Sequence, residues 1–244
     1  MKFRTLCYQC YPAKSTVDFD MSISISETDL YEYRCSLGHV TLLELQVFKF
    51  EILFESGLCA IRDKYFMESI LSITAALERF YEFFIKIILK KQNISEELIE
   101  KSFKTMSRQS ERQVGAFTVL YLSTFLELPK MLKQKMITFR NDVVHKGYLP
   151  NENETLEYAE EVYNTIKPIY LKLLEDYSRT IMNYQLDIKK GRREKYKDII
   201  KKNNNPILGI APDLTLTHVL NIDSFRNRTF QESFQTLTKN GVYM

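Results

Sequence analysis

Arg140 and His145 stand with four residues between them in the stretch Phe-Arg-Asn-Asp-Val-Val-His-Lys-Gly-Tyr-Leu-Pro, at positions 139–150. An arginine side chain carries a permanent positive charge and presents a fork of N–H donors that matches a phosphate group. A histidine side chain titrates close to neutral pH, so its imidazole can both accept and donate a proton. These two residue types are the minimum set for cleaving a phosphodiester without a metal ion. The stretch is therefore a candidate site for phosphate chemistry.

This Arg-x4-His string, with Asn141 directly after the arginine and a Val-Val-His-Lys-Gly continuation, resembles the HEPN superfamily of helical endoribonucleases and toxins. The stretch at positions 69–84, Ser-Ile-Leu-Ser-Ile-Thr-Ala-Ala-Leu-Glu-Arg-Phe-Tyr-Glu-Phe-Phe, is similar to the second core helix of that fold. The resemblance implies a mainly α protein with an antiparallel helical bundle. It also implies a homodimer that cleaves RNA without a metal ion at a site between its protomers, as a toxin or an antiviral defence effector.

The resemblance assigns a role to each residue of the motif. His145 would act as general acid or base, and Arg140 would stabilise the charge on the phosphate. Asn141 would orient the histidine or the phosphate. Glu78, in the second stretch, is a candidate partner for Arg140, although an ordinary surface carboxylate is the simpler interpretation.

One position departs from the family pattern. Some members carry a tyrosine two residues after the histidine, and a nucleotidyltransferase antitoxin modifies it with AMP. Here that position is Gly147, and Tyr148 comes one residue later. The motif therefore predicts no particular antitoxin, and any regulatory partner stays unidentified.

A helical projection at about 100° per residue gives the motif an orientation. Four apolar residues define its buried face: Leu132, Met136, Phe139 and Val143. His145 projects away from that face, Asn141 lies one turn before it on the same side, and Arg140 lies on the flank. Gly147 can end the helix just beyond the histidine. We therefore expect an exposed histidine that is not part of the core.

Three cysteines and a histidine near the N-terminus form a second candidate site, written Cys-x2-Cys and Cys-x3-His: Cys7, Cys10, Cys35 and His39. Three thiolates and one imidazole suit tetrahedral zinc, and Gly38 permits a tight turn within the second pair. Because four protein ligands leave no open position, we expect a structural zinc ion in a zinc-ribbon-like segment. The alternative is a set of incidental reduced cysteines on a β-hairpin. Cys59 is expected to be a small core residue.

The composition is that of an ordinary soluble globular protein, with 45% hydrophobic and 27% charged residues in 244 positions. The sequence has no continuous apolar run of about 20 residues, so we expect no membrane span. The first residues lack the apolar core of a signal peptide, and the four cysteines fit a reducing environment. We therefore expect a cytoplasmic protein.

A basic segment covers positions 189–202, where eight Lys or Arg side chains stand against two carboxylates, although the net charge of the chain is only +3. Such a segment can follow a phosphate backbone. Its first four cations are candidate RNA-binding residues: Lys189, Lys190, Arg192 and Arg193. An equally good interpretation is a solvated helix face beyond the end of the core.

Hydrophobic periodicity predicts helices for most of the chain. They are expected at 42–63, 66–87, from Ser95 to 107 or 109, at 112–125, from Pro129 through the motif, from Asn151 into the basic segment, and at 230–237. Asn151 and Glu154 should form a capping box, and Pro168 should kink the last long helix. Strands are expected at 17–20, 21–26 and 214–222. This pattern predicts a β segment at 1–41, a helical bundle at 42–202 and an irregular C-terminal extension at 203–244.

Three interpretations of the function follow. The first is a metal-independent endoribonuclease acting through Arg140 and His145. The second is a non-catalytic HEPN-like module that binds nucleic acid or a protein partner, since a fold does not determine a function. The third is a helical scaffold in which His145 is only a cation at a helix end. The presence of the arginine, the asparagine and the histidine together favours the enzyme.

Overall fold

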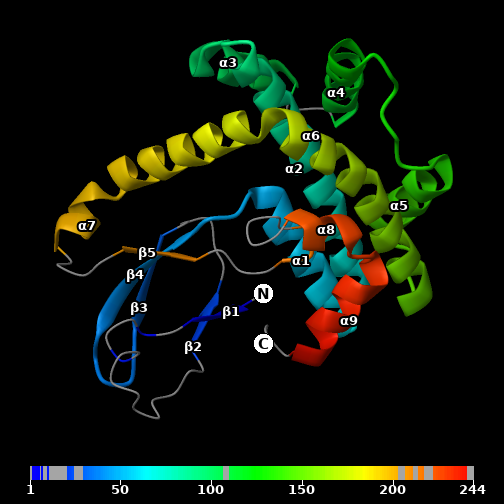
Figure 1. The fold of residues 1–244 in the computed structure, drawn as a ribbon. Coiled ribbons are helices and arrows are strands. Elements are labelled where there is room, and N and C mark those ends of the chain that lie inside the picture. Colours follow the sequence, from blue (N-terminus) through cyan, green and yellow to red (C-terminus); the bar gives the residue numbers. More distant parts are fainter. Residues whose placement is uncertain are drawn as a thin grey trace. The chain divides into compact units, whose positions relative to one another are not determined.

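The computed structural model describes residues 2–5, 7, 10, 21–24, 30–106, 110–202, 207–210, 214–216 and 222–240 (Figure 1). These residues are mainly helical, with small β-sheets, as expected for the fold class. The helices are α1 (Lys49–Arg62), α2 (Phe66–Lys91), α3 (Glu96–Met106), α4 (Ser110–Phe125), α5 (Gln134–Lys146), α6 (Glu152–Lys195), α7 (Lys197–Lys202), α8 (Ile222–Asn227) and α9 (Phe230–Asn240). The strands are β1 (Lys2–Thr5), β2 (Met21–Ser24), β3 (Leu30–Arg34), β4 (Val40–Leu45) and β5 (Ile207–Ile210). Within this described part, no helix combines the length and the apolar character that crossing a bilayer requires.

The chain divides into two compact units, and each is described by itself. The sheet unit comprises residues 1–47, 185–213 and 231–244, and the helical unit comprises residues 48–184 and 214–230. This division differs from the boundaries expected after positions 41 and 202. The first segment of the sheet unit extends beyond residue 41, and the chain beyond residue 202 contributes to both units.

The sheet unit contains two small sheets. β1 and β2 pair antiparallel, so the strand expected from position 21 is confirmed. The strand expected at 17–20 lies outside the described residues. In the second sheet, β4 pairs antiparallel with β3 and parallel with β5, with Leu42 opposite Ile207. The sequence gives no strand signal for β5, because a strand of four residues is too short to show a period.

Residues 42–45 end strand β4 and do not begin a helix, which corrects the expectation of a helix from Leu42. All residues from Thr41 to Leu45 are buried. The strand therefore shows no alternation between apolar and polar residues, and an apolar run of this kind does not distinguish a buried strand from a buried helix. The helix begins at Lys49, where the Glu51 carboxylate accepts a hydrogen bond from the Phe48 amide at 2.6 Å.

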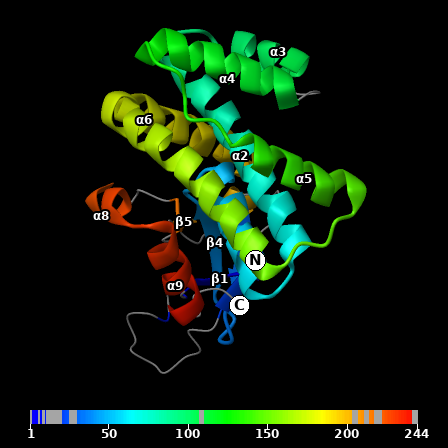
Figure 2. The same cartoon turned by 90° about the vertical axis from the view of Figure 1, so that its right-hand side faces the viewer.

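Helix α2 lies at the centre of the helical unit and contacts α1, α3, α4 and α5 (Figure 2). Phe80 and Phe83 of α2 pack their rings against Phe50 of α1, at centroid distances of 5.2 and 5.1 Å. Both also contact Tyr170 of α6, at 6.1 and 5.8 Å. Fully burying one such ring contributes roughly 1.5–3 kcal/mol. The helix expected at 66–87 is confirmed, and its aromatic residues belong to the core.

Helix α6 begins with the expected capping box. The Asn151 side chain accepts a hydrogen bond from the Glu154 amide at 3.0 Å, and the Glu154 carboxylate accepts one from the Asn151 amide at 2.9 Å. The helix is interrupted at Tyr177, whose torsion angles are φ −126° and ψ 15°. This break lies well beyond Pro168, the expected position of the kink.

Helices α3 and α4 match their expected positions, whereas α5 starts later than expected. The Ser95 hydroxyl accepts a hydrogen bond from the Leu98 amide at 3.4 Å, as a residue that caps α3 should. The residues expected to end α3, 107–109, lie outside the described part. Helix α5 begins at Gln134 and not at Pro129, because Lys133 before it is still extended. A proline is tolerated in a first turn but does not by itself start a helix.

The chain returns to the helical unit after residue 213. Leu214 and Leu216 are buried, and the Thr215 amide donates a hydrogen bond to the Glu55 carboxylate at 2.8 Å. Where described, this stretch is not the expected strand, since residues 215 and 216 form a turn and Ile222 begins helix α8. The helix expected at 230–237 is confirmed as the first part of α9.

Candidate functional site

The turn between β3 and β4 supplies two members of the cysteine and histidine set. The Cys35 amide donates to the His39 carbonyl at 3.0 Å, and the Gly38 amide donates to the Cys35 carbonyl at 2.9 Å. Gly38 has a φ of +83°, a conformation that side-chain-bearing residues rarely adopt. The turn therefore needs this glycine to bring both side chains to the same side of the hairpin end.

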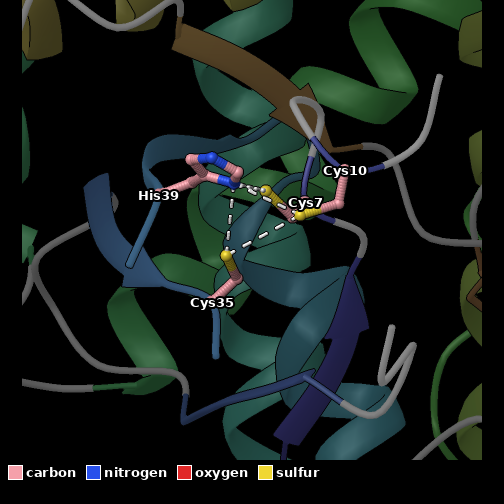
Figure 3. Close-up of side chains that lie close together, drawn as sticks. All are labelled: Cys7, Cys10, Cys35 and His39. Carbon is pink, nitrogen blue, oxygen red and sulfur yellow. Dashed lines mark hydrogen bonds between the residues drawn. The ribbon is translucent and has the colours of Figure 1, made fainter. Parts of the chain in front are cut away.

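The N-terminal pair meets this turn, although it is far away in the sequence (Figure 3). The His39 Nδ1 atom lies 3.3 Å from the Cys10 sulfur, 3.6 Å from the Cys35 sulfur and 3.8 Å from the Cys7 sulfur. The Cys10 and Cys35 sulfurs are 3.8 Å apart. All four side-chain atoms lie within 4.8 Å of one another, and the three cysteines are buried. The structure thus brings together all four residues that the sequence predicts.

The four separations given above are close to the edges of a metal-centred tetrahedron. Zinc bonds of about 2.3 Å to sulfur and about 2.0 Å to nitrogen place sulfurs roughly 3.8 Å apart, and sulfur and nitrogen roughly 3.5 Å apart. The observed distances of 3.3–3.8 Å agree with these values. A disulfide would instead need two sulfurs at about 2.0 Å. The four residues could therefore bind a metal ion.

The thiols in this cluster do not titrate alike. Burial and the neighbouring Cys7 and Cys35 thiols raise the pKa of Cys10 to about 12. Burial also opposes ionisation of Cys35, but backbone hydrogen bonds from His39 and Leu37, together with the other two thiols, lower its pKa to about 7. A thiolate with several hydrogen-bond donors around it is the ligand form that a metal ion requires.

Cys59 takes no part in the cluster. It is buried on α1, and its pKa is raised to about 12, first by burial and then by the nearby Glu55 carboxylate. A thiol held neutral in this way is a small core residue, as the sequence predicts.

The motif helix α5 has the orientation that the projection predicts, except that Leu132, expected on its buried face, lies before the helix and is only partly buried. Met136 and Val143 are buried, and Phe139 packs its ring between Tyr148 and Tyr158, at 6.1 and 6.0 Å. On the opposite side of this helix His145 is exposed, while Arg140 and Asn141 are partly exposed. The three motif residues therefore flank or leave the core and remain available to solvent.

Arg140 is held by its neighbour. Its Nη1 atom donates a hydrogen bond to the Asn141 Oδ1 atom at 2.9 Å. The buried Tyr158 of α6 has its hydroxyl 2.8 Å from the hydroxyl of Thr74 on α2. Burial raises the pKa of Tyr158, the hydrogen bond with Thr74 and the charge of Arg140 lower it, and the charge of Glu78 raises it.

Gly147 ends the motif helix directly after the exposed turn. Its φ of +70° is left-handed, and both its own amide and that of Tyr148 donate to the Asp142 carbonyl. Lys146 pairs with the Asp142 carboxylate at 2.7 Å. The Tyr148 hydroxyl donates to Glu154 of α6 at 2.8 Å. The end of α5 that carries His145 is therefore fixed on both sides.

The basic segment is divided between buried and exposed cations. Arg192 is only 10% exposed, and it donates to the Leu45 carbonyl at 2.9 Å and lies 3.4 Å from the Glu44 carboxylate. Arg193 lies 3.7 Å from the same carboxylate, and Lys190 is exposed. Glu44 is 1% exposed within β4, so this pairing compensates a buried charge. Sequence reasoning missed Glu44, whose only signal is a carboxylate inside an apolar strand.

Comparison of the chain with protein-family models, with curated proteins and with solved structures finds no match.

Proposed function

We propose that the protein is a metal-independent endoribonuclease of HEPN type, in which Arg140, Asn141 and His145 provide half of an RNA-cleaving site and a second copy of the chain provides the other half. The observation that carries this proposal is the exposure of His145 at a fixed helix end, one turn from the Arg140–Asn141 hydrogen bond. A histidine that serves to fill the core would be buried, and His145 is not. The resemblance of the motif to this superfamily supports the same conclusion.

The chemistry follows from the side chains. The His145 imidazole removes the proton of a ribose 2′-hydroxyl, and the 2′-oxygen attacks the adjacent phosphorus. The His145 side chain of the second copy, in its protonated imidazolium form, donates its proton to the 5′-oxygen as the bond from this oxygen to phosphorus breaks. Arg140 neutralises the charge that accumulates on the phosphate oxygens. The products are a 2′,3′-cyclic phosphate and a 5′-hydroxyl end.

Asn141 acts on the arginine in this scheme. Because its Oδ1 atom accepts a hydrogen bond from Arg140, it fixes the direction of the guanidinium before a phosphate arrives. An enzyme that cleaves cellular RNA harms its own host unless it is restrained. This fits a toxin or an antiviral defence effector in the cytoplasm, held in check by a regulatory partner that is not identified.

We further propose that Cys7, Cys10, Cys35 and His39 hold a structural zinc ion. The donor set, the separations and the burial of the thiols fit this ion. The four residues complete a tetrahedral set, so the ion has no position for a substrate and serves to join the N-terminal pair to the β3–β4 turn. The ion would crosslink a small segment that buries too little apolar area to be stable alone.

A non-catalytic binding module is the second candidate, and the exposed cations of the basic segment favour it. Lys190, Arg193 and Lys195 are exposed near the end of α6 and could contact a phosphate backbone or an acidic protein surface. Arg192 is less suited to this role, because its guanidinium is directed at Glu44 and Leu45. In this reading the protein binds RNA but leaves it intact.

The two candidates are separated by incubating total RNA with the purified protein in buffer without added divalent cations. The wild type should cleave RNA and leave cyclic phosphate ends. His145→Ala should lose at least about a hundredfold in rate, as expected for the loss of a general acid or base. Lys146→Ala is the matched control, since it removes an exposed cation from the same helical turn.

Intact RNA with the wild type, or equal cleavage by His145→Ala, would refute the enzyme. RNA binding that persists in the absence of cleavage would instead support the binding module. Loss of activity in Lys146→Ala to the same extent as in His145→Ala would show that a general loss of positive charge explains the effect.

A further inference from the structure

Two thiols of the cysteine and histidine cluster are in direct contact. The Cys10 and Cys35 sulfurs lie 3.8 Å apart, although the two residues are 25 positions apart in the sequence (Figure 3). A disulfide holds its sulfurs at about 2.0 Å, so this pair needs to close by only about 1.8 Å. The contact that suits a shared metal ion is therefore also a starting geometry for a disulfide.

Both thiols stand at turns and not inside a strand. Cys35 directly follows β3, and the Cys10 amide donates a hydrogen bond to the Cys7 carbonyl at 3.2 Å. The pairing of β3 with β4 ends at Arg34 and does not include Cys35. The two sulfurs can therefore approach each other through small movements of their side chains and turns, while the paired strands stay in place.

A disulfide between these two thiols is incompatible with the metal site. Of the four cysteines in the chain, Cys59 lies outside the cluster. Linking Cys10 to Cys35 therefore leaves only Cys7 and His39 as ligands, which is half of the set that a structural zinc ion needs. A thiolate is both the ligand of zinc and the form of cysteine that oxidants attack. The cluster thus has two alternative states, one with a metal ion and one with a disulfide.

We propose that the cluster is a redox switch, in which hydrogen peroxide converts the zinc-bound form to a Cys10–Cys35 disulfide and the ion leaves. Cys10 is the more exposed of the two, at 9% against 4%, so its thiolate meets the oxidant first. This thiolate attacks one oxygen of the peroxide, the O–O bond breaks, and with one proton from solvent the products are a sulfenic acid and water. The Cys35 thiolate then attacks the sulfenic sulfur and expels hydroxide, which a second proton converts to water. In sum, two thiolates, one hydrogen peroxide and two protons give one disulfide and two water molecules.

The switch keeps a crosslink and changes what it holds. The metal ion and the disulfide both join the N-terminal pair to the β3–β4 turn, so oxidation does not separate these two segments. His39 loses its metal partner, and the turn that precedes it, residues 36–38, is exposed, so the structural change is concentrated in this turn. Removal of a ligand by mutation differs, because it leaves no crosslink at all. The inference rests on the zinc ion proposed above and is independent of RNA cleavage.

Treatment of the zinc-loaded full chain with hydrogen peroxide tests the switch. The wild type should release its zinc ion, measured with a chromogenic chelator, and gain a Cys10–Cys35 disulfide, identified by peptide mass spectrometry. Hydrogen exchange should rise at residues 36–39 and stay unchanged in β4, and Cys59→Ala should behave like the wild type. A chain that binds no zinc before peroxide is added refutes the zinc site itself. A zinc-loaded chain that keeps its ion, or that forms a different disulfide, overturns the switch.

Two matched variants test which thiols react. Cys10→His and Cys7→His each replace one thiolate with an imidazole and leave two cysteines and two histidines, a set that also suits zinc. Only Cys10→His removes the contacting pair, so peroxide should release its zinc about tenfold more slowly than that of Cys7→His. Equal rates of release would overturn the assignment of the pair. If neither variant binds zinc, the disulfide identified in the wild type decides, since any linkage other than Cys10–Cys35 contradicts the proposal.

Discussion

The cysteine and histidine cluster and the Arg140–His145 motif differ in how much of each one chain contains. The cluster draws Cys7 and Cys10 from one segment and Cys35 and His39 from another, and the four ligand atoms lie within 4.8 Å of one another. The motif is a short string on a single helix, and its histidine is exposed. The geometry of the cluster can therefore be compared directly with that of a metal site. The motif, under the function proposed for it, becomes a complete site only with a substrate and a second copy of the chain.

Loss of the proposed metal ion should produce the largest effect, and its structural consequences should be confined to the sheet unit. Cys35→Ser removes one ligand, and structural zinc sites in small domains contribute roughly 10 kcal/mol or more of binding free energy. We expect loss of one bound zinc ion per chain, measured by native mass spectrometry. Hydrogen exchange should rise in β3 and β4, while the helical circular dichroism signal of the helical unit is kept.

Cys59→Ala is the control for this change, because it removes a buried thiol that lies outside the cluster. It should retain the zinc ion and lose only some core packing. A wild type that carries no zinc, or a Cys35→Ser variant that still binds it with unchanged exchange, would contradict the assignment of the cluster.

A rise in pH should lower the stability of the helical unit and strengthen metal binding by the cysteine and histidine cluster. The helical unit responds through Glu51, a buried carboxyl. Burial raises its pKa from 4.5 to about 8, although the Phe48 amide and the Tyr170 hydroxyl partly lower it. Between these two pKa values the folded protein holds a proton that the unfolded chain releases. Stability from this group is therefore complete below about pH 4.5 and is lost as the pH rises to about 8. Metal binding to thiols, in contrast, strengthens as the pH rises.

Glu51→Gln should abolish the loss of stability that the wild type shows as the pH rises from 4.5 to 8. The free energy of unfolding of the variant, relative to the wild type, should rise by up to roughly 5 kcal/mol between pH 4.5 and pH 8. Urea unfolding at several pH values measures it. Glu68→Gln is the control, since Glu68 occupies the corresponding first-turn position of α2 and is exposed. If the two variants show the same pH dependence, the buried carboxyl does not control stability.

Arg140→Lys should alter the motif and leave the fold of both regions unchanged. Lysine keeps the charge but cannot present two parallel donors to a phosphate, and it cannot hold the same contact with Asn141. We expect a fall of about tenfold to a hundredfold in the rate of RNA cleavage. The melting temperature and the zinc content should stay close to those of the wild type.

Lys135→Ala serves as the control for Arg140→Lys, because it removes a cation from the first turn of α5, where the side chain pairs with Glu157. Cleavage by this variant should match the wild type. A conservative change at Arg140 that has no effect on cleavage would mean that the arginine acts only through its charge.

Features that depend on neighbouring residues were predictable from the sequence. The seam of α2, the capping box of Asn151 and Glu154, and Gly147 at the end of α5 each follow from spacings within one or two helical turns. The cluster was predictable for another reason, since metal ligands are few in kind and their spacing is restricted. The exposure of His145 followed from the helical period alone.

Features that depend on distant segments were not predictable. The pairing of β5 with β4 joins residues 207–210 to residues 42–45, and no pattern within either segment predicts it. The same holds for Arg192, which reads as a solvated cation in the sequence and is directed at buried Glu44 in the fold. The start of α5 was misplaced because a proline permits a helix start without requiring one.

The smallest expected effect tests whether the fixed end of α5 matters for the motif. Gly147→Ala forces a side chain into a left-handed conformation and should cost about 1 kcal/mol in the free energy of unfolding. Gly191→Ala is the matched control, because Gly191 lies inside α6 with open space around its Cα and should stabilise that helix by a few tenths to about 1 kcal/mol. Urea unfolding measures both changes, which should have opposite signs.

The two glycine variants also separate stability from catalysis. Gly147→Ala loosens the turn that carries His145, so RNA cleavage should fall severalfold even at a temperature where the protein stays folded. Gly191→Ala, far along the chain from the motif, should leave cleavage unchanged. Equal cleavage by both variants would mean that the exposed histidine works without a fixed helix end.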